Sequence, residues 1–242
     1  MVDHGSMACG RIAHDPARYA AVPWHLDNSA ELAHTAPKSL GRNLRACWTP
    51  LCYDNNVLPV CTVATTANII SLQFFLKTGS TLITSIDAVV SNFSAITGCQ
   101  DDDAAIIATG GARILDVLDY STTKGFQTGQ QTPAALVPAR IAHDDIAGMQ
   151  HAIFNKGAVS IGVALSQSDK VMDVWDTVAP LSSGDPTPGS WALHNCFIAD
   201  YDGNQPDDRV LIGTWGIWKV ATWRWVTSRL VDQEAYSLSS VA

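Results

Sequence analysis

The sequence lacks several features that define whole classes of protein. It has no apolar run near the roughly 20 residues that a membrane-spanning helix needs, and its residues 69–76 are interrupted by Ser71 and Gln73. It also lacks a basic run, and 15 Lys+Arg against 23 Asp+Glu give a net charge of -8. The sequence therefore predicts no transmembrane segment, no membrane partner and no nucleic-acid partner.

Charged residues are scarce, at 16%, whereas hydrophobic residues make up 47%. This balance is typical of a globular chain with a sizeable core and excludes disorder along the whole length. Cysteine is also sparse: six residues among 242 are too few for a disulfide scaffold. No Cys-x-x-Cys pair suggests a zinc site, and the sequence does not fix any disulfide pairing. The open question is whether one cysteine is a nucleophile.

The first 44 residues lack a regular hydrophobic period, and Pro16, Pro23 and Pro37 interrupt any long helix. We expect residues 1–44 to form an extended leader that wraps the domain. The printed N-terminus lacks the positive start and apolar stretch of a secretory signal. This leaves a cytoplasmic location, a virion or another export route open.

From residue 45 onward the hydrophobic pattern changes once. Helical spacing predicts helices near 61–76, 84–97, 110–124 and 144–157, and apolar runs then predict strands at 158–165, 195–201, 209–212 and 219–226. Helices followed by strands predict an α+β domain over 45–235, with a helical half at about 45–156 and an antiparallel β half at about 157–235. We expect a functional site in a groove between the halves.

Cys61 opens the first of these helices. Unpaired N–H groups and the helix dipole stabilise negative charge at this position, which lowers a thiol pKa. The same N–H groups can bind the oxyanion of a tetrahedral intermediate, and Asn55, six residues upstream, is the candidate side-chain donor. A cysteine in a helix is more often a small buried apolar residue, so Cys61 needs a partner before it indicates catalysis.

His194 supplies that partner at the start of an apolar strand, 133 positions after Cys61. This interval agrees with the known spacing of nucleophile and histidine in papain-like enzymes. The run Gly213-Thr214-Trp215-Gly216 follows in a later strand region.

Together these segments resemble the papain-like cysteine peptidases, in particular divergent bacterial and phage-type members. Asp54, Leu58, Cys61 and Thr62 match the segment around the family's nucleophile. The run 194–201 resembles the strand that carries its histidine, 213–216 resembles its Asn-Ser-Trp-Gly segment, and 110–111 resembles its Gly-Gly pair. These landmarks occur in the family's order, so the resemblance implies a papain-like fold.

The resemblance also exposes departures. Gly213 stands where the family has the Asn that orients the histidine, and Thr214 can replace it only if the backbone shifts by one position. Asn55 replaces a Gln, so the oxyanion donor is one methylene shorter. The resemblance places Trp215 beside the histidine as a shield.

These residues predict a cysteine peptidase that acts on a peptide or protein through Cys61 and His194, without a metal or organic cofactor. The alternative is a weak or inactive papain-like fold that serves as a binding or structural protein, which Gly213 favours. Another acyl transfer, such as deamidation, ranks below both. The leader is about half as long as the family's inhibitory propeptide, so we expect it not to inhibit.

Overall fold

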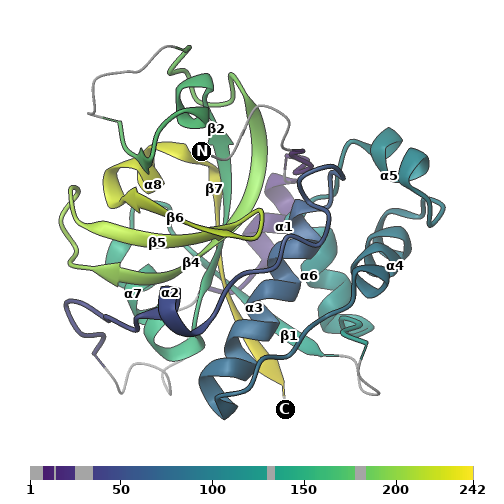
Figure 1. Cartoon of the computed structure of the whole chain (residues 1–242), viewed down its shortest axis with the longest axis horizontal. Helices are drawn as coiled ribbons and strands as arrows, with labels where there is room; N and C mark the ends of the chain where they lie inside the picture. The colour runs from purple at the N-terminus through teal and green to yellow at the C-terminus, as the bar shows by residue number, and fades with distance from the viewer. Residues whose placement is uncertain (1–7, 14, 25–34, 130–133, 178–183, 242) are drawn as a thin grey trace.

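The computed structural model describes residues 8–13, 15–24, 35–129, 134–177 and 184–241. Four helices lie together on one side of the molecule (Figure 1). They are α3 (Cys61–Thr78), α4 (Ile86–Thr97), α5 (Asp103–Thr109) and α6 (Ile114–Thr123). The other side is a sheet flanked by α7 (Ile146–Lys156) and α8 (Trp223–Arg229) (Figure 1). The predicted α+β architecture is confirmed.

The described strands form one sheet in the order β1-β7-β2-β4-β5-β6-β3. Its pairs are antiparallel except β3 with β6. The strands are β1 (Ala135–Ile141), β2 (Val159–Leu165), β3 (Val174–Trp175), β4 (Ala192–Asp202), β5 (Arg209–Thr214), β6 (Ile217–Thr222) and β7 (Leu230–Val241).

The helix α3 is a core helix. Every side chain from Cys61 to Leu72 is buried, including its Thr, Asn and Ser residues, so the helix has no solvent-facing stripe in this stretch. It ends at Gly79, whose φ of 73° is the left-handed conformation that glycine adopts at a helix C-terminus. Burial on all sides fixes the position of Cys61 relative to the sheet.

The inner strand β2 is buried along its whole length. It pairs antiparallel with β4, and Val163 lies opposite His194 in the register. The histidine therefore belongs to the middle of the sheet, where neighbouring strands restrict its backbone.

Several predicted elements need correction. The four predicted helices and the strands at 158–165, 195–201 and 209–212 are present, but the predicted strand at 219–226 divides into the end of β6 and the helix α8. Thr222 caps α8 by accepting a hydrogen bond from the Trp225 N–H. Strand β1 lies within the predicted helical half, and Pro138 is tolerated there because β1 is an edge strand.

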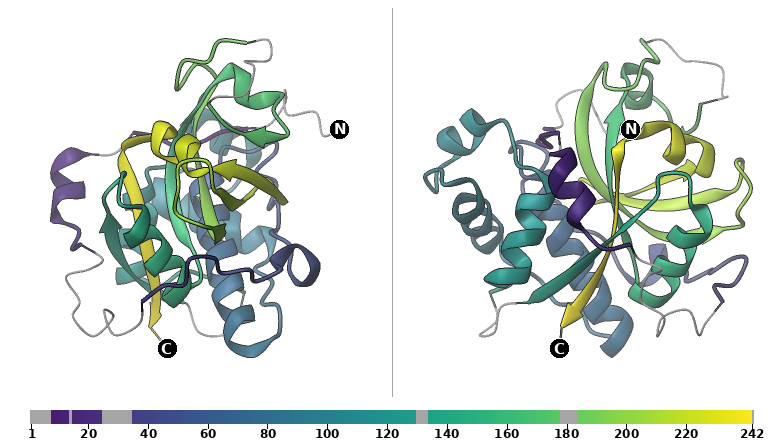
Figure 2. Two further views of the ribbon diagram at one scale, coloured as in Figure 1. Left: turned by 90° about the vertical axis from the view of Figure 1, so that its left-hand side faces the viewer. Right: turned by 180° about the vertical axis from the view of Figure 1, so that it is seen from behind.

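The described part of the leader is packed on the domain. Its helix α1 (Pro16–Ala21) lies over α6 and the β1–β7 edge (Figure 2), and Arg18 bonds Asp116 and Asp119 of α6 at 2.5 Å each. A second helix, α2 (Leu44–Cys47), ends the leader. Between them, Arg42 donates hydrogen bonds to carbonyl groups of α7 and β4.

Candidate active site

Cys61 lies at the first position of α3, and its side chain is fully buried. The turn before it contains two residues with positive φ, Tyr53 and Asp54, and the Leu58 N–H donates to the Asp54 carbonyl at 2.8 Å. The first intrahelical bonds begin with the Val63 N–H, so the N–H of Cys61 itself precedes the helical ladder. This is the geometry in which a helix N-terminus stabilises an anion.

His194 is held on two sides. Its Nε2 lies 2.8 Å from the Thr214 hydroxyl, and the Trp215 ring stacks on the imidazole with centroids 4.2 Å apart and an interplanar angle of 17°. Its Nδ1 is buried and makes no hydrogen bond within the described residues. The ring is therefore fixed through Nε2, which leaves Nδ1 to exchange a proton.

The start of α3 packs against the part of β4 that carries the histidine. The Thr65 hydroxyl donates to the carbonyl of Asn195 at 3.0 Å, and the backbone N–H of Asn195 hydrogen-bonds the Cys61 sulfur. The residue after His194 thus contacts the candidate nucleophile directly, which brings the two predicted catalytic residues to one place.

Asn55 is also buried in this region, with 3% of its surface exposed. Its backbone N–H donates to the Cys52 carbonyl at 3.0 Å, and its side-chain Oδ1 makes no hydrogen bond within the described residues. A buried amide oxygen without a partner is rare, and Oδ1 is the acceptor end of the amide, whereas the oxyanion role predicted for Asn55 requires the Nδ2 donor.

Residues 8–12, here called the inner leader, cover Cys61. The Gly10 N–H donates to the Cys61 sulfur at 3.4 Å. On one side the Trp215 Nε1–H donates to the Ala8 carbonyl at 3.2 Å, and on the other the Ala112 N–H donates to the Gly10 carbonyl at 2.8 Å. The inner leader therefore fills the boundary between the halves where the groove is predicted.

Two glycines permit this close approach. A Cβ at Gly10 would lie 1.9 Å from the carbonyl oxygen of Pro59, and a Cβ at Gly111 would lie 1.8 Å from the carbonyl oxygen of Gly10. Either contact is far inside the van der Waals limit. The inner leader therefore lies in direct contact with the candidate nucleophile.

Burial controls the ionisation of both catalytic candidates. Desolvation raises the pKa of the Cys61 thiol to about 11, although the N–H groups of Gly10 and Asn195 and the charge of Arg11 favour the thiolate. Burial also lowers the pKa of the His194 imidazole to about 3. At neutral pH the covered site therefore holds a neutral thiol and a neutral imidazole.

Comparison with solved structures identifies the fold. Xylellain, a cysteine protease from Xylella fastidiosa, is similar with a TM-score of 0.63 at 16% identity, covering 98% of this chain and 97% of that one. Procathepsin L 3 from the larval midgut of Tenebrio molitor gives a TM-score of 0.61 at 10% identity over 98% of this chain and 77% of its own. The fold is papain-like. No protein-family model and no curated protein sequence matches the chain.

The β4–β5 pairing explains why position 213 is a glycine, which leaves the side chain of Thr214 to reach the histidine. Gly213 pairs with Phe197 in the β4–β5 ladder, and a Cβ at Gly213 would lie 2.1 Å from the Phe197 ring. The space beside Gly213 is therefore filled by an aromatic ring. Thr214, the next residue, supplies the hydroxyl that bonds the histidine. This is the shift by one position that the sequence requires if Thr214 is to replace the family's Asn.

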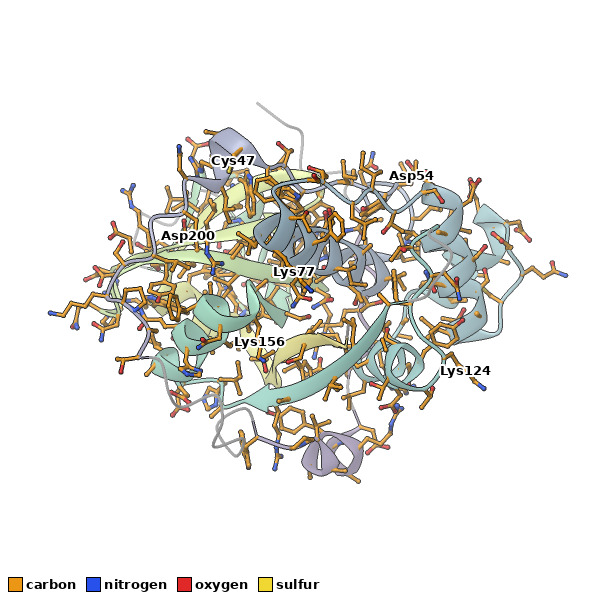
Figure 3. All side chains as sticks on the ribbon, turned by 90° about the horizontal axis from the view of Figure 1, so that it is seen from below. Cys47, Asp54, Lys77, Lys124, Lys156 and Asp200 are labelled. Carbon is orange, nitrogen blue, oxygen red and sulfur yellow. The ribbon has the colours of Figure 1, made fainter. Side chains whose placement is uncertain are left out.

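The described residues contain no disulfide bond, and the exposed Cys47 lies at the periphery on α2 (Figure 3). The described residues contain no group of three His, Cys, Asp or Glu side chains arranged to hold a metal. No described helix is long and apolar enough to cross a membrane.

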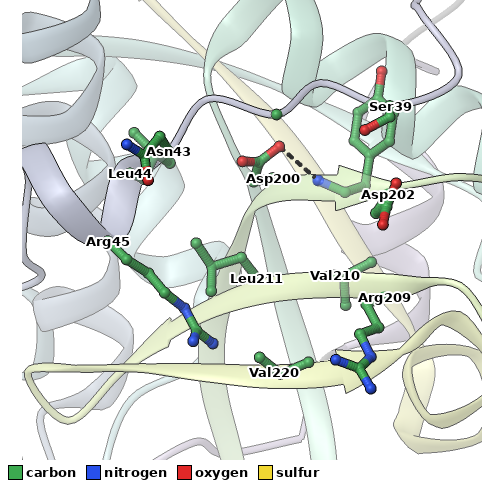
Figure 4. Close-up of a pocket in the computed structure, with 12 residues that line it drawn as sticks. Ser39, Asn43, Leu44, Arg45, Asp200, Asp202, Arg209, Val210, Leu211 and Val220 are labelled. Atoms are coloured by element: carbon green, nitrogen blue, oxygen red, sulfur yellow. Dashed lines mark hydrogen bonds between the residues drawn. The ribbon is translucent and has the colours of Figure 1, made fainter.

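A pocket of about 410 Å³ lies over β4, β5 and β6, apart from the catalytic candidates (Figure 4). Its floor contains Leu211 and Val220, and Arg45 and Arg209 approach from two sides. Neither Cys61 nor His194 lines it, so this pocket is separate from the candidate active site.

Sequence reasoning missed the inner leader. Gly10 and Arg11 lie in an irregular polar stretch with no periodic pattern, and their hydrogen bonds to Cys61 and Glu234 span 51 and 223 positions. No local signal in a single sequence identifies such a contact.

Proposed function

We propose that this protein is a cysteine peptidase whose inner leader covers the catalytic pair in the structure described. The observation that carries the proposal is the arrangement around His194. Thr214 and Trp215 fix the ring, while Nδ1 remains without a hydrogen bond and the next residue contacts the Cys61 sulfur. The papain-like neighbours support a peptidase at the level of the family.

In the proposed reaction His194 Nδ1 takes the thiol proton of Cys61, and the thiolate attacks a peptide carbonyl carbon. The oxyanion is stabilised by the Cys61 N–H and the Asn55 side-chain amide. The imidazolium then protonates the leaving amine as the C–N bond breaks. Water attacks the thioester with His194 as base, which releases the acid and restores the thiol.

The inner leader is itself a poor substrate, because it offers the Gly10 N–H to the sulfur instead of a carbonyl carbon. A peptide substrate needs the same space, so the inner leader must move before catalysis. We therefore replace the expectation of a non-inhibitory leader with an inhibitory one.

The second candidate is a binding or structural protein on the same scaffold. Two observations favour it: a Thr214 hydroxyl bonds His194 where the family uses an amide side chain from the preceding position, and Cys61 and His194 are both fully buried. In that case the Cys61 thiol would have the pH dependence of alkylation of an ordinary cysteine, even when the inner leader is displaced.

The test measures the rate at which iodoacetamide alkylates Cys61 in the full chain as a function of pH. Digestion and mass spectrometry of the labelled protein separate the Cys61 peptide from those of the other cysteines. Gly10→Ala opens the site, because its Cβ cannot coexist with Pro59. Ala13→Val, at an exposed leader position, is the matched control. We expect slow labelling in the parent and the control. In Gly10→Ala we expect rapid labelling down to about pH 5, lost on adding His194→Ala.

If Cys61 in Gly10→Ala labels only above about pH 8 and is indifferent to His194, the peptidase proposal fails and the binding protein is favoured. A Gly10→Ala chain that labels no faster than Ala13→Val would instead contradict the inhibitory role of the inner leader.

A further inference from the structure

A second thiol lies beside the candidate nucleophile, on the segment that covers it. Cys9 directly precedes Gly10, whose N–H donates to the Cys61 sulfur at 3.4 Å. The backbone of Cys9 is held on both sides, because the carbonyls of its two neighbours, Ala8 and Gly10, accept hydrogen bonds from the domain. The inner leader therefore brings a cysteine from near the N-terminus to the start of α3.

The separation of the two cysteines is close to that of a disulfide bond. Backbone geometry places the Cα of Cys9 about 2.4 Å from the Gly10 nitrogen, so this Cα lies no more than about 6 Å from the Cys61 sulfur. In a disulfide the Cα of one cysteine lies about 4 Å from the sulfur of the other. A turn of the Cys9 side chain and a shift of the inner leader by no more than about 2 Å therefore suffice to join the sulfurs.

The ionisation of the thiols also indicates that they lie close together. Burial, and after it the Cys61 sulfur, raise the pKa of the Cys9 thiol. Burial, followed by the sulfurs of Cys61 and Cys9, raises the pKa of the Cys196 thiol. A neighbouring charge shifts a pKa in this way only at short range. All three thiols are neutral at neutral pH while the inner leader covers Cys61, so they react slowly with oxidants in this state.

Of these two neighbours, Cys9 is the better partner for Cys61. Cys196 has no exposed surface, and it pairs with Ile161 on β4, an inner strand of the sheet. A bond from Cys61 to Cys196 would therefore distort the sheet. Cys9 is partly exposed, and it belongs to a segment that the proposed function already requires to move.

We propose that Cys9 is a resolving cysteine, which converts a peroxide-oxidised Cys61 into a disulfide. When the inner leader opens, the Cys61 sulfur attacks hydrogen peroxide, the O–O bond breaks, and a sulfenic acid and one water form. When the inner leader returns, the Cys9 sulfur attacks the Cys61 sulfur and the S–O bond breaks. The hydroxide leaves with the Cys9 proton as a second water, so two thiols are oxidised by one peroxide.

The disulfide preserves the nucleophile. A sulfenic acid that meets no thiol is oxidised further to a sulfinic acid, which thiol reductants do not restore, whereas a disulfide is reduced by thiol exchange. While the bond lasts, it also keeps the inner leader over Cys61. The opening step rests on the proposed function, but the short separation of the two cysteines does not.

The first experiment identifies the bond. The full chain is treated with millimolar hydrogen peroxide, the remaining thiols are blocked with N-ethylmaleimide, and the protein is denatured and digested with trypsin and Asp-N without reduction. Cleavage after Arg11 and before Asp54 places Cys9 and Cys61 on separate peptides, each with a single cysteine. We expect these two peptides to appear as a disulfide-linked pair in the mass spectrum, and dithiothreitol to separate them.

The second experiment removes the resolving thiol with Cys9→Ser, and Cys47→Ser, at an exposed thiol on α2, is the matched control. After peroxide and then dithiothreitol, we expect about tenfold less Cys61 thiol in Cys9→Ser than in the parent or the control, because Cys61 becomes a sulfinic acid. Cys9→Ala repeats the comparison if Cys9→Ser fails to fold. Equal recovery with and without Cys9, or a bond from Cys61 to Cys196, would overturn the proposal.

A separate assay distinguishes this proposal from the peptidase function. Hydrolysis of peptides is measured with Gly10→Ala, in which the inner leader is displaced. A bond between Cys9 and Cys61 without hydrolysis of any peptide would sink the peptidase function and keep the resolving cysteine. Hydrolysis by Gly10→Ala, with Cys61 oxidised to the sulfinic acid in the parent chain, would do the reverse.

Discussion

At the scale of single residues, Thr214 decides how the imidazole of His194 is oriented. Its hydroxyl lies 2.8 Å from Nε2, and Trp215 covers the ring face. A neutral hydroxyl holds an imidazole less strongly than a charged acceptor does, but it still fixes the ring and directs Nδ1 away from β5.

Replacing Thr214 with Val removes the hydroxyl and keeps the shape of the side chain. We expect kcat in the Gly10→Ala chain to fall about 10- to 100-fold, the effect of leaving a buried hydrogen-bond partner unsatisfied, while KM changes little. Thr214→Ser should retain activity within a few fold, and Thr123→Val, at an exposed position, should have no effect. A rise in KM with kcat unchanged would mean that Thr214 contacts substrate instead of positioning the histidine.

Residue chemistry could be read partly from the sequence. Cys61 and His194 follow from the helix start and the strand start, and the structure brings them to one place. Whether the Thr214 hydroxyl reaches His194 could not be predicted, because it depends on the path of β5 beside β4, where Phe197 fills the space next to Gly213.

At the scale of elements, a buried carboxylate ties the end of β2 to α8. Asp169 accepts hydrogen bonds from the Arg229 Nε at 3.0 Å, the Trp225 Nε1 at 2.9 Å and the Ser166 N–H at 2.7 Å. Asp169 and Arg229 are almost completely buried. The network explains why residues 223–229 form a helix here instead of continuing the strand.

Asp169→Asn would leave the charge of Arg229 buried without its counter-ion. We expect the free energy of unfolding in urea to fall by about 3–5 kcal/mol. The matched control is Asp119→Asn, which breaks the exposed pair with Arg18 and should cost less than about 1 kcal/mol. Equal losses in the two variants would contradict a special role for the buried network.

At the scale of the whole molecule, the inner leader joins the two halves across the active site. Cys61 and Ala112 contact it from the helical half and Trp215 from the β half, and the Arg11 side chain is anchored in the sheet. His194 is fully buried in this fold, so ionisation of the histidine is coupled to the stability of the fold.

The pKa of His194 is about 3 in this fold, against an ordinary value of 6.5. Between these two pH values His194 is therefore protonated in the unfolded chain and neutral in the folded one. The stability of the fold that is present above pH 6.5 is lost as the pH falls toward 3. We expect the contribution of His194 to the free energy of unfolding to fall by about 2 kcal/mol between pH 7.5 and pH 5. Urea unfolding at the two pH values measures this change. His194→Gln should flatten this slope, whereas His143→Gln, at a side chain 38% exposed, should not. An unchanged slope in His194→Gln would refute the assignment.

The sequence by itself determined four of the helices, three of the strands, the α+β class and the candidates Cys61 and His194, because hydrophobic period and helix-start chemistry are local properties. Only the tertiary structure decided that Thr214 orients the histidine, that Gly10 covers the thiol and that Arg11 meets Glu234. Those contacts join residues up to 223 positions apart, and their energies depend on burial and shape complementarity, which no local pattern encodes.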